Sequence, residues 1–228
     1  KNAVCYRFSH PTVYLRARAV ARLYIKGSYA CTGWLVSHSP SLLLTNEHCL
    51  KSQDDVDNTD FEFMGEESTC TATDGDCVMC DRGVSFDAGL LLKVSYDKDY
   101  ALVEMEGNPA LTYGYLHIDH RDIFQLTKVP IYIPQHGLGH AKEIAMSDDN
   151  HPGEGCQILG TRPKCRSSIH TEELAYSCDT EGGSSGSPIL AQDTNKVIAL
   201  HHCGSDCEAG NLAVPMSLIY PESKGYIH

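Results

Sequence analysis

The chain of 228 residues contains 18 Lys and Arg against 30 Asp and Glu, which gives a formal net charge of -12 at pH 7. A protein that binds nucleic acid needs clusters of basic residues, so this balance argues against nucleic acid as a partner. The hydrophobic content of 42% is ordinary for a globular protein and excludes a disordered one. The length allows one large core or two small lobes.

The apolar runs and the number of cysteines indicate the cellular location of the protein. No apolar run reaches the roughly 18 residues that cross a bilayer, and no leader-like segment opens the chain, so we expect a soluble, processed protein without a membrane partner. The 11 cysteines are too many for a reduced cytosolic protein of this size. We therefore expect a secreted, extracellular protein with disulfide bonds. The odd number leaves one thiol unpaired or bonded outside the chain.

The first part of the chain has the short apolar stretches that are typical of β-strands. Residues 1–18 form a polar, Arg-rich lead-in, and residues 51–60 have the acidic composition of a surface loop. Apolar runs bounded by turn residues predict strands at residues 19–26, 29–36, 42–45, 61–64, 90–94 and 101–105. We expect residues 19–106 to form an N-terminal β-barrel.

A second set of strands follows a connecting segment, residues 107–128, which is rich in turn residues. Strands are predicted at residues 131–133, 143–146, 156–160, 174–178, 188–190, 197–200 and 211–216. Many short strands with few helical periods predict an all-β protein. Residues 129–228 are expected to form a C-terminal β-barrel and a short tail.

The most informative stretch runs from Asp179 to Leu190 and reads DTEGGSSGSPIL. Glycine and small polar residues surround Ser185. A serine becomes an effective nucleophile when a base accepts its proton and backbone N–H groups hold the developing oxyanion. Glycine at position 183 lets the N–H groups of Gly183 and Ser185 point into one hollow. The alternative is a flexible Gly/Ser loop, and a histidine and a buried acid elsewhere would decide between the two.

Both of these partners are present upstream. His48 ends an apolar run beside Cys49, and Asp99 lies at the start of the apolar segment 101–105. Along the chain the three residues come in the order His, Asp, Ser. This is a known order for a catalytic base, its orienting acid and a nucleophilic serine. Together the three residues favour nucleophilic catalysis over a flexible loop.

Several segments also match the motifs of a known family: residues 30–36 (ACTGWLV), 44–49 (LTNEHC), 99–103 (DYALV), 131–136 (IYIPQH), 182–188 (GGSSGSP) and 197–202 (VIALHH). With them the chain resembles the trypsin/chymotrypsin-like serine proteases, and more narrowly the secreted microbial lysyl endopeptidase and glutamyl endopeptidase branches. The resemblance implies two six-stranded antiparallel β-barrels (the chymotrypsin-like fold) with the active site between them. It also implies a hydrolase that cleaves protein or peptide substrates through an acyl-enzyme, without a metal or organic cofactor.

The resemblance implies a role for each candidate residue. Ser185 attacks the scissile carbonyl, His48 acts as general base and then as general acid, and Asp99 orients the imidazole. The N–H groups of Gly183 and Ser185 form the oxyanion hole. Glu47, next to the base, either approaches the imidazole and favours its charged form or points to solvent, and we expect the second.

The resemblance also implies disulfide pairs. We expect Cys31 with Cys49, which clamps the histidine loop in family members, and Cys5 with Cys207, as in lysyl endopeptidase. Cys156 and Cys165 are placed to close a local hairpin. The loop-closure entropy of the first pair would stabilise the fold by roughly 3 kcal/mol.

The specificity pocket has two interpretations. Asp179 falls where trypsin-like enzymes carry the acid that binds Lys or Arg, whereas Thr180 and His201 resemble pocket residues of glutamyl endopeptidases. In lysyl endopeptidase the acid lies in a later loop, where this chain offers Asp206 and Glu208. Because a carboxylate at 179 would repel an acidic side chain, we expect cleavage after Lys or Arg. A glutamyl-type specificity, or an Asp179 that caps a strand end, is the alternative.

Other classes of function stay open as alternatives. One is an inactive protease homologue that binds partners. Another is a Cys/His metal site built from the spacing C-x6-C-x2-C at Cys70, Cys77 and Cys80, with residues 201–203. We favour a disulfide-bonded surface loop there, because a fourth ligand at suitable spacing is missing, and we expect no bound metal. We also expect a monomer.

Overall fold

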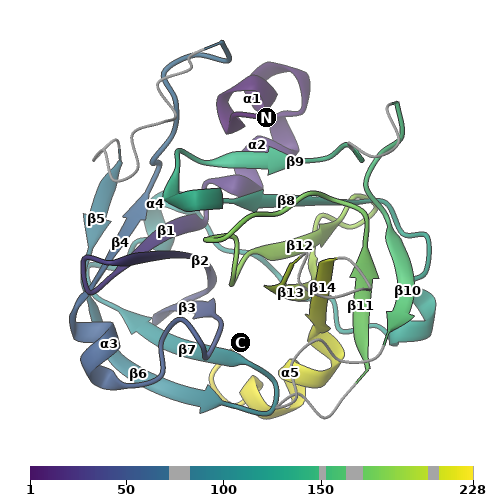
Figure 1. The fold of residues 1–228 in the computed structure, drawn as a ribbon. Coiled ribbons are helices and arrows are strands. Elements are labelled where there is room, and N and C mark those ends of the chain that lie inside the picture. Colours follow the sequence, from purple (N-terminus) through teal and green to yellow (C-terminus); the bar gives the residue numbers. More distant parts are fainter. Residues whose placement is uncertain (72–82, 149–152, 163–171, 205–210, 228) are drawn as a thin grey trace.

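A computed structural model describes residues 1–71, 83–148, 153–162, 172–204 and 211–227, and the chain folds into two antiparallel β-sheets (Figure 1). The first sheet contains β1 (Val20–Ile25), β2 (Tyr29–His38), β3 (Ser41–Thr45), β4 (Thr59–Phe63), β5 (Val84–Phe86), β6 (Ala88–Ser95) and β7 (Tyr100–Met105). Their order in the sheet is β5-β4-β1-β2-β3-β7-β6. The sequence did not predict β5, because a three-residue edge strand is too short for alternation to reveal it.

The second sheet is built from the later part of the chain. It contains β8 (Ile131–Gln135), β9 (Glu143–Ala145), β10 (Ile158–Arg162), β11 (Glu173–Tyr176), β12 (Pro188–Ala191), β13 (Val197–Cys203) and β14 (Asn211–Pro215). Their order is β10-β11-β14-β13-β12-β8-β9. The all-β, chymotrypsin-like arrangement is confirmed, with 7-stranded sheets among the described residues where six strands each were expected.

Short helices lie around the sheets: α1 (Tyr6–Ser9), α2 (Pro11–Ala17), α3 (Gln53–Asp57), α4 (Ala110–Tyr113) and α5 (Met216–Ser223), with 3-10 turns η1 (Ala3–Cys5), η3 (Ile123–Gln125) and η4 (Gly137–Gly139). Within the described ranges, none of these helices has both the length and the apolar sequence that a bilayer crossing needs.

Two of these helical regions differ from the expected irregular segments. Residues 1–18 are not merely a polar lead-in, since Val13 and Ala17 on α2 are buried against the rest of the molecule. The acidic segment 51–60 contains α3, because Ser52 and Asp55 form a capping box that satisfies the N–H groups at the start of the helix.

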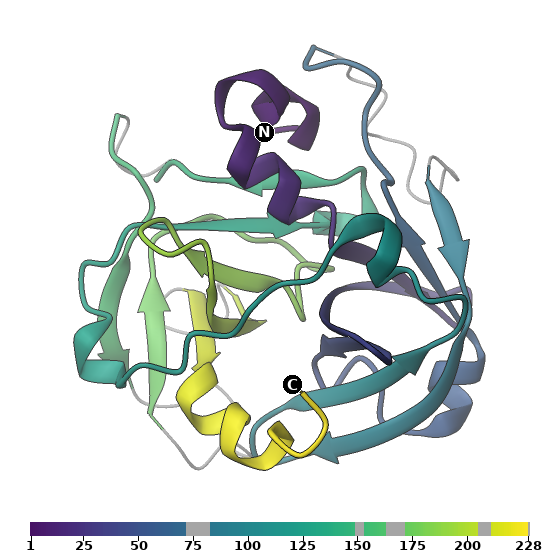
Figure 2. The same cartoon turned by 180° about the vertical axis from the view of Figure 1, so that it is seen from behind.

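Helix α5 lies at the open edge between the two sheets and replaces part of the expected tail (Figures 1 and 2). Its Ile219 is fully buried. Its Glu222 accepts a hydrogen bond of 3.2 Å from the Tyr100 hydroxyl and forms an ion pair with Lys98. The C-terminal helix of the second half therefore holds the turn of the first half that carries Asp99.

One hydrophobic cluster reaches across both halves. It contains Trp34 and Phe61 from the first sheet and Tyr132 and Leu200 from the second, all with no exposed surface. A smaller cluster around Ile133 lies within the second half. Because the large cluster is shared, the two sheets pack against each other directly, and residues from both can meet at one site.

The disulfides correct part of the sequence-based pairing. The bond between Cys31 and Cys49 is confirmed. The other two expected pairs are wrong, since the structure has Cys5–Cys70 and Cys156–Cys178. Cys156 and Cys178 meet because β10 and β11 are antiparallel, so the residues before β10 lie beside those after β11. Cys5 and Cys70 meet because η1 lies against the loop after β4. No described cysteine is free, and Cys165 and Cys207 lie outside the described residues.

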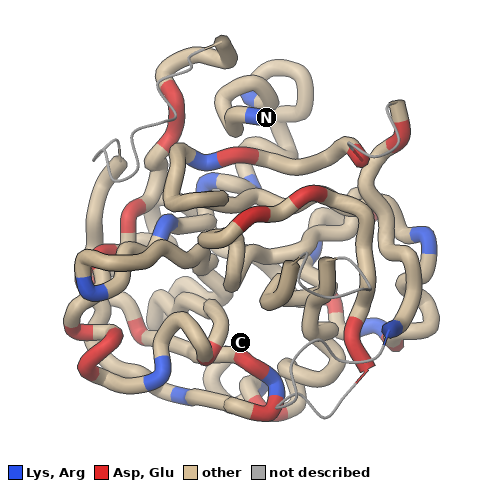
Figure 3. Tube along the Cα trace, viewed as in Figure 1, with Lys and Arg blue, Asp and Glu red and all other residues tan. Residues whose placement is uncertain are grey.

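Charged residues lie mostly on the loops and edges of both halves, where acidic positions predominate (Figure 3). An exception is the ion pair between Arg22 on β1 and Glu62 on β4, whose side chains are 5% and 4% exposed. Arg22 Nη1 also donates a hydrogen bond of 2.8 Å to the Gly139 carbonyl. This buried pair therefore ties the first sheet to η4 of the second half.

The buried pair is expected to contribute strongly to stability. Glu62→Ala removes the carboxylate from a buried guanidinium, so the free energy of unfolding should fall by about 3–5 kcal/mol. The control Asp54→Ala removes a partner of Lys26 from the surface, where screening by solvent should keep the loss much smaller. Thermal unfolding followed by circular dichroism measures both variants, and equal losses would contradict this account.

Candidate active site

The serine loop, residues 179–187, runs between β11 and β12 and carries Ser185. Gly183 and Gly186 have φ angles of 94° and 89°, values that residues with a side chain rarely adopt. A Cβ on Gly186 would lie 2.0 Å from the Thr32 carbonyl oxygen, and one on Gly183 would lie 2.8 Å from the His136 carbonyl oxygen. The loop needs glycine at both positions because neighbouring backbone presses directly against it.

Thr32, on β2, holds the serine loop from the first half. Its N–H donates to the Ser185 carbonyl at 2.8 Å, and its hydroxyl donates to the Gly183 carbonyl at 3.0 Å. The same hydroxyl accepts the His136 N–H at 3.1 Å, and the Thr32 carbonyl accepts the Thr45 hydroxyl at 2.7 Å. The first sheet therefore sets the position of Ser185 through hydrogen bonds as well as packing.

The peptide between Gly182 and Gly183 is oriented by η4. The Gly182 carbonyl accepts a hydrogen bond from the Leu138 N–H. Because C=O and N–H point in opposite directions across a trans peptide, the Gly183 N–H points away from η4. Among the described residues, the N–H groups of Gly183 and Ser185 have no hydrogen-bond partner. Two available donors next to a serine are what an oxyanion-binding hollow requires.

His48 and Asp99 come together because β3 and β7 are paired antiparallel strands. His48 follows β3, and Asp99 directly precedes β7. The His48 N–H donates to Asp99 Oδ1 at 2.9 Å, and His48 Nδ1 lies 2.7 Å from Asp99 Oδ2. The Asn46 side chain donates to the Asp99 carbonyl at 2.8 Å. Backbone and side chain of Asp99 are thus both held by the histidine segment.

Asp99 is 1% exposed, and its surroundings decide its charge. Burial raises the pKa of this carboxyl, but the contacts with His202 and His48 outweigh burial and hold the pKa well below its ordinary value. Asp99 is therefore a carboxylate throughout the neutral range.

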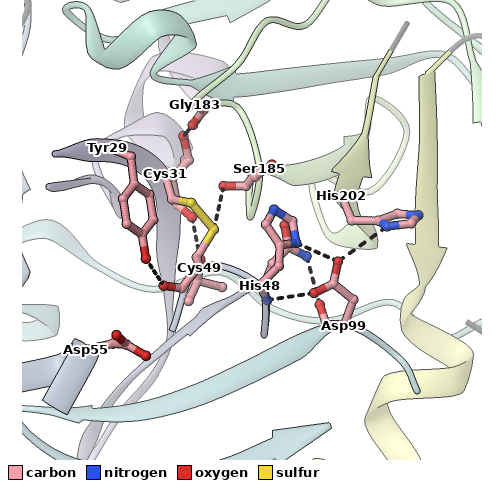
Figure 4. Close-up of a disulfide and its surroundings, with 12 residues drawn as sticks. Tyr29, Cys31, His48, Cys49, Asp55, Asp99, Gly183, Ser185 and His202 are labelled. Carbon is pink, nitrogen blue, oxygen red and sulfur yellow. Dashed lines mark hydrogen bonds and ion pairs between the residues drawn. A yellow bond between two sulfur atoms is a disulfide. The ribbon is translucent and has the colours of Figure 1, made fainter. Parts of the chain in front are cut away.

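The structure brings Ser185 to the same place from the second half. The sulfur of Cys49, the residue after His48, lies 3.9 Å from the Ser185 carbonyl oxygen. Figure 4 shows His48 Nε2, the ring nitrogen that does not contact Asp99, pointing toward Ser185. No hydrogen bond joins the Ser185 hydroxyl to this imidazole in the described part of the chain. The three residues named from the sequence thus meet where the two sheets face each other.

Glu47 and His202 differ from what the sequence indicated. Glu47 is 8% exposed, so the expectation that it points to solvent is wrong. His202 Nδ1 lies 3.4 Å from Asp99 Oδ2, a contact that the sequence analysis did not anticipate. The available signal was a pair of consecutive histidines ending a buried strand, where an imidazole without polar partners would be costly.

Of the predicted pocket residues, Thr180 is part of the serine loop, and His201 is hydrogen-bonded to it through the backbone of Gly186 and Ser187. His201 Nδ1 is 2.6 Å from the Tyr176 hydroxyl. Burial, and next the charge of His202, lower the pKa of His201 to about 3, so this imidazole is neutral. The Thr180 hydroxyl lies 3.8 Å from the position that a Cβ on Gly204 would occupy. Thr180 and Gly204 therefore face each other.

Asp179, the third predicted pocket residue, lines a cavity together with Gln135, Glu143 and Glu181. The walls of this cavity come from β8, β9, η4 and the serine loop, together with Lys1. The Asp179 carbonyl accepts a hydrogen bond of 3.1 Å from the Gln135 side chain. The other candidate acids, at positions 206 and 208, lie outside the described residues.

Two of the cysteines in the alternative Cys/His metal site form disulfide bonds and so offer no thiolate. Cys70 is bonded to Cys5, and Cys203 is also disulfide-bonded. Cys77 and Cys80 lie outside the described residues. The sulfur atoms that gather next to His48 are those of the Cys31–Cys49 disulfide, which is not a thiolate pair.

The sequence matches the profile of a known family over almost its whole length. The profile of "Lysyl endopeptidase, C-terminal domain" covers residues 1–213.

Two curated relatives match the chain. A protein of Plasmopara viticola named "Secreted RxLR effector protein 73" is 38% identical over 207 residues, which are 90% of this chain and 49% of the relative. An uncharacterized protein of Sinorhizobium fredii is 28% identical over 204 residues, covering 83% of this chain and 28% of the relative. The chain thus spans half or less of the length of these relatives.

Solved structures share the fold. A glutamyl endopeptidase structure has a TM-score of 0.62 at 18% identity, over 92% of this chain and 90% of the other. A protease from M. tuberculosis, solved in its active form, has a TM-score of 0.66 at 12% identity, over 96% of this chain and 85% of the other. At these identities the likeness establishes the fold alone.

The close approach at Gly186 can be tested through stability. Gly186→Ala combines a positive φ with a clash against the Thr32 carbonyl, so unfolding should become easier by about 2–5 kcal/mol. In Gly182→Ala the new Cβ meets nothing within 4 Å, and the change should stay within about 0.5 kcal/mol. Thermal unfolding compares the two, and wild-type stability in both variants would contradict the packing described.

Proposed function

Because this chain belongs to the lysyl endopeptidase C-terminal domain family, we propose that it is a serine endopeptidase with Ser185 as nucleophile, His48 as base and Asp99 as orienting acid. The observation that carries the proposal is the Asp99 carboxylate bonded to the backbone N–H and to Nδ1 of His48. This contact leaves Nε2 on the side of Ser185 (Figure 4).

The contact between His48 and Asp99 defines the first proton transfer. A carboxylate only accepts hydrogen bonds, so the proton of neutral His48 sits on Nδ1 and Nε2 is free to act as a base. As Ser185 attacks the peptide carbonyl, Nε2 takes the hydroxyl proton and Asp99 stabilises the imidazolium. The imidazolium then protonates the leaving amine, and water hydrolyses the acyl-enzyme by the same steps. The Ser185–His48 hydrogen bond forms when substrate fills the site, since such bonds are often long in free enzymes.

The oxyanion of the tetrahedral intermediate is bound by the N–H groups of Gly183 and Ser185. The bond from Leu138 to the Gly182 carbonyl holds the peptide that carries the Gly183 N–H, and the bond from Thr32 to the Gly183 carbonyl holds the next peptide, before substrate arrives. Donors that need no rearrangement stabilise the transition state most strongly, and losing one typically costs about 100- to 1,000-fold in turnover.

We infer that the enzyme is secreted and acts on protein or peptide chains outside the cell. Disulfides such as Cys31–Cys49 persist in oxidising compartments. The relative in Plasmopara viticola is named as a secreted effector, which agrees with this location.

Cleavage after Lys or Arg is the specificity we propose. The neutral His201, engaged by the Tyr176 hydroxyl, supplies no positive charge for an acidic side chain. Asp179 and Thr180 lie in the segment leading to Ser185 and offer a carboxylate and a hydroxyl. A glutamyl-type specificity is the alternative, and it would require His201 to become charged against its burial.

A second candidate function is that of a binding protein that retains the fold without activity. The observation that favours it is the 38% identity to a protein named as an effector. The two functions differ in the reactivity of Ser185.

Covalent labelling tests the proposed nucleophile. A peptidyl phosphonate diester should modify wild-type protein at Ser185, as located by mass spectrometry, because His48 accepts the serine proton. Ser185→Ala should remain unlabelled. Asp99→Asn should lower kcat by roughly 10,000-fold, since the imidazole then adopts the wrong tautomer. His117→Gln is the control and should label normally. A folded wild-type protein that never reacts would favour the binding function.

Digestion of a peptide library tests the specificity. Products should end mainly in Lys or Arg, and Asp179→Asn should reduce kcat/KM for these peptides far more than for uncharged ones, because the charge pair is lost. Products that end in Glu, with no effect of Asp179→Asn, would support the glutamyl alternative instead.

A further inference from the structure

His202 lies on β13 between two buried carboxylates. Its Nδ1 is 3.4 Å from Asp99 Oδ2, and its Nε2 is 3.3 Å from Glu173 Oε2 on β11. The side chains of His202 and Glu173 are 0% exposed, and that of Asp99 is 1% exposed. In Figure 4 a dashed line joins the near nitrogen of the His202 ring to the Asp99 carboxylate. At these distances the contacts are ion pairs rather than well-formed hydrogen bonds.

The placement of both carboxylates indicates the charge of the ring. A neutral imidazole has one N–H and one nitrogen lone pair, so one of the two carboxylates would face a lone pair. In a buried site this arrangement is repulsive. A protonated ring presents an N–H to each carboxylate. Burial lowers the pKa of His202, but the contacts with Asp99 and Glu173 outweigh burial and raise it overall.

Among the residues that the structure describes, the other groups packed around His202 are neutral or engaged elsewhere. The neighbouring His201 is neutral, with a pKa lowered to about 3. The strands on either side, β12 and β14, contain no ionisable side chain. From α5, Glu222 is engaged by Lys98 and Tyr100. His48 is a further ionisable neighbour within the described residues, and it reaches His202 through Asp99.

Asp99 Oδ2 is thus shared by two imidazoles, at 2.7 Å from His48 Nδ1 and 3.4 Å from His202 Nδ1. We propose that His202 is a positioning residue, an imidazolium held between Asp99 and Glu173 that fixes the Asp99 carboxylate for His48 and offsets part of its negative charge. The proposal rests on the proposed function of His48 and Asp99 as base and orienting acid. Glu173 in turn keeps His202 charged.

A positive charge behind Asp99 has a kinetic consequence. It makes the protonated, inactive form of His48 harder to produce, so the enzyme works at lower pH than it would with Asp99 alone. Substrate does not touch His202, so the effect belongs to kcat and to the pH profile, whereas KM should be little affected.

The variants His202→Gln and Glu173→Gln test this role. His202→Gln keeps a side chain that can donate to Asp99 but removes the charge, and Glu173→Gln removes the anion that holds the charge in place. In both, the acid limb of kcat/KM should move to higher pH by about one unit, with kcat reduced about tenfold and KM within about twofold of wild type. His117→Gln serves as the control and should leave the limb in place. Reduced kcat with an unmoved acid limb in both variants would show a merely structural role and overturn the proposal.

Histidine NMR provides a readout that requires neither activity nor a stable variant. In wild-type protein labelled with 15N-histidine, one buried ring should keep the two similar nitrogen shifts of an imidazolium at neutral pH, and this signal should be absent from His202→Gln. If His202→Gln does not fold, Glu173→Gln can identify the same signal by its titration at lower pH. A spectrum in which every buried ring is neutral at pH 7 would overturn the proposal. Failure of the phosphonate to label Ser185 would instead reject the proposed function and leave the NMR result standing.

Discussion

The burial of the Asp99 carboxylate is the constraint on which the site depends. Removing a carboxylate from water costs several kcal/mol unless protein donors replace the lost hydrogen bonds. The backbone N–H and the imidazole of His48 supply these donors, and Asn46 holds the Asp99 backbone. The turn before β7 and the segment after β3 therefore satisfy each other's polar groups, and neither can move far without leaving a buried charge without donors.

A second set of contacts joins the two halves around the serine loop. Thr32 binds the loop from the first sheet, while Leu138 of η4 binds the Gly182 carbonyl from the second half. The buried Arg22 of the first sheet donates to Gly139 and so holds η4 in place. The Gly183 N–H and the peptide that follows it are thus oriented by hydrogen bonds that originate in both halves of the molecule. Such prior orientation is what makes backbone N–H groups effective at stabilising a developing charge.

The charged groups behind the site link activity to stability. Asp99 is approached from the first half by His48 and from the second half by His202, which in turn contacts Glu173. Buried charges of this kind stabilise a fold weakly compared with apolar packing, and breaking one contact is costly. Their presence next to the base is therefore better explained by what they do to Asp99 than by stability alone.

The sequence by itself determined the all-β class, most strand positions and the candidates His48, Asp99 and Ser185. These features are local: apolar runs bounded by turns predict strands, and each candidate lies in a short, distinctive motif. Only the tertiary structure decided the partners of Cys5 and Cys156, the helices at both ends of the chain, and the contact of His202 with Asp99. All of these depend on which distant segments are brought together by sheet pairing and shared packing, and one-dimensional spacing does not contain that information.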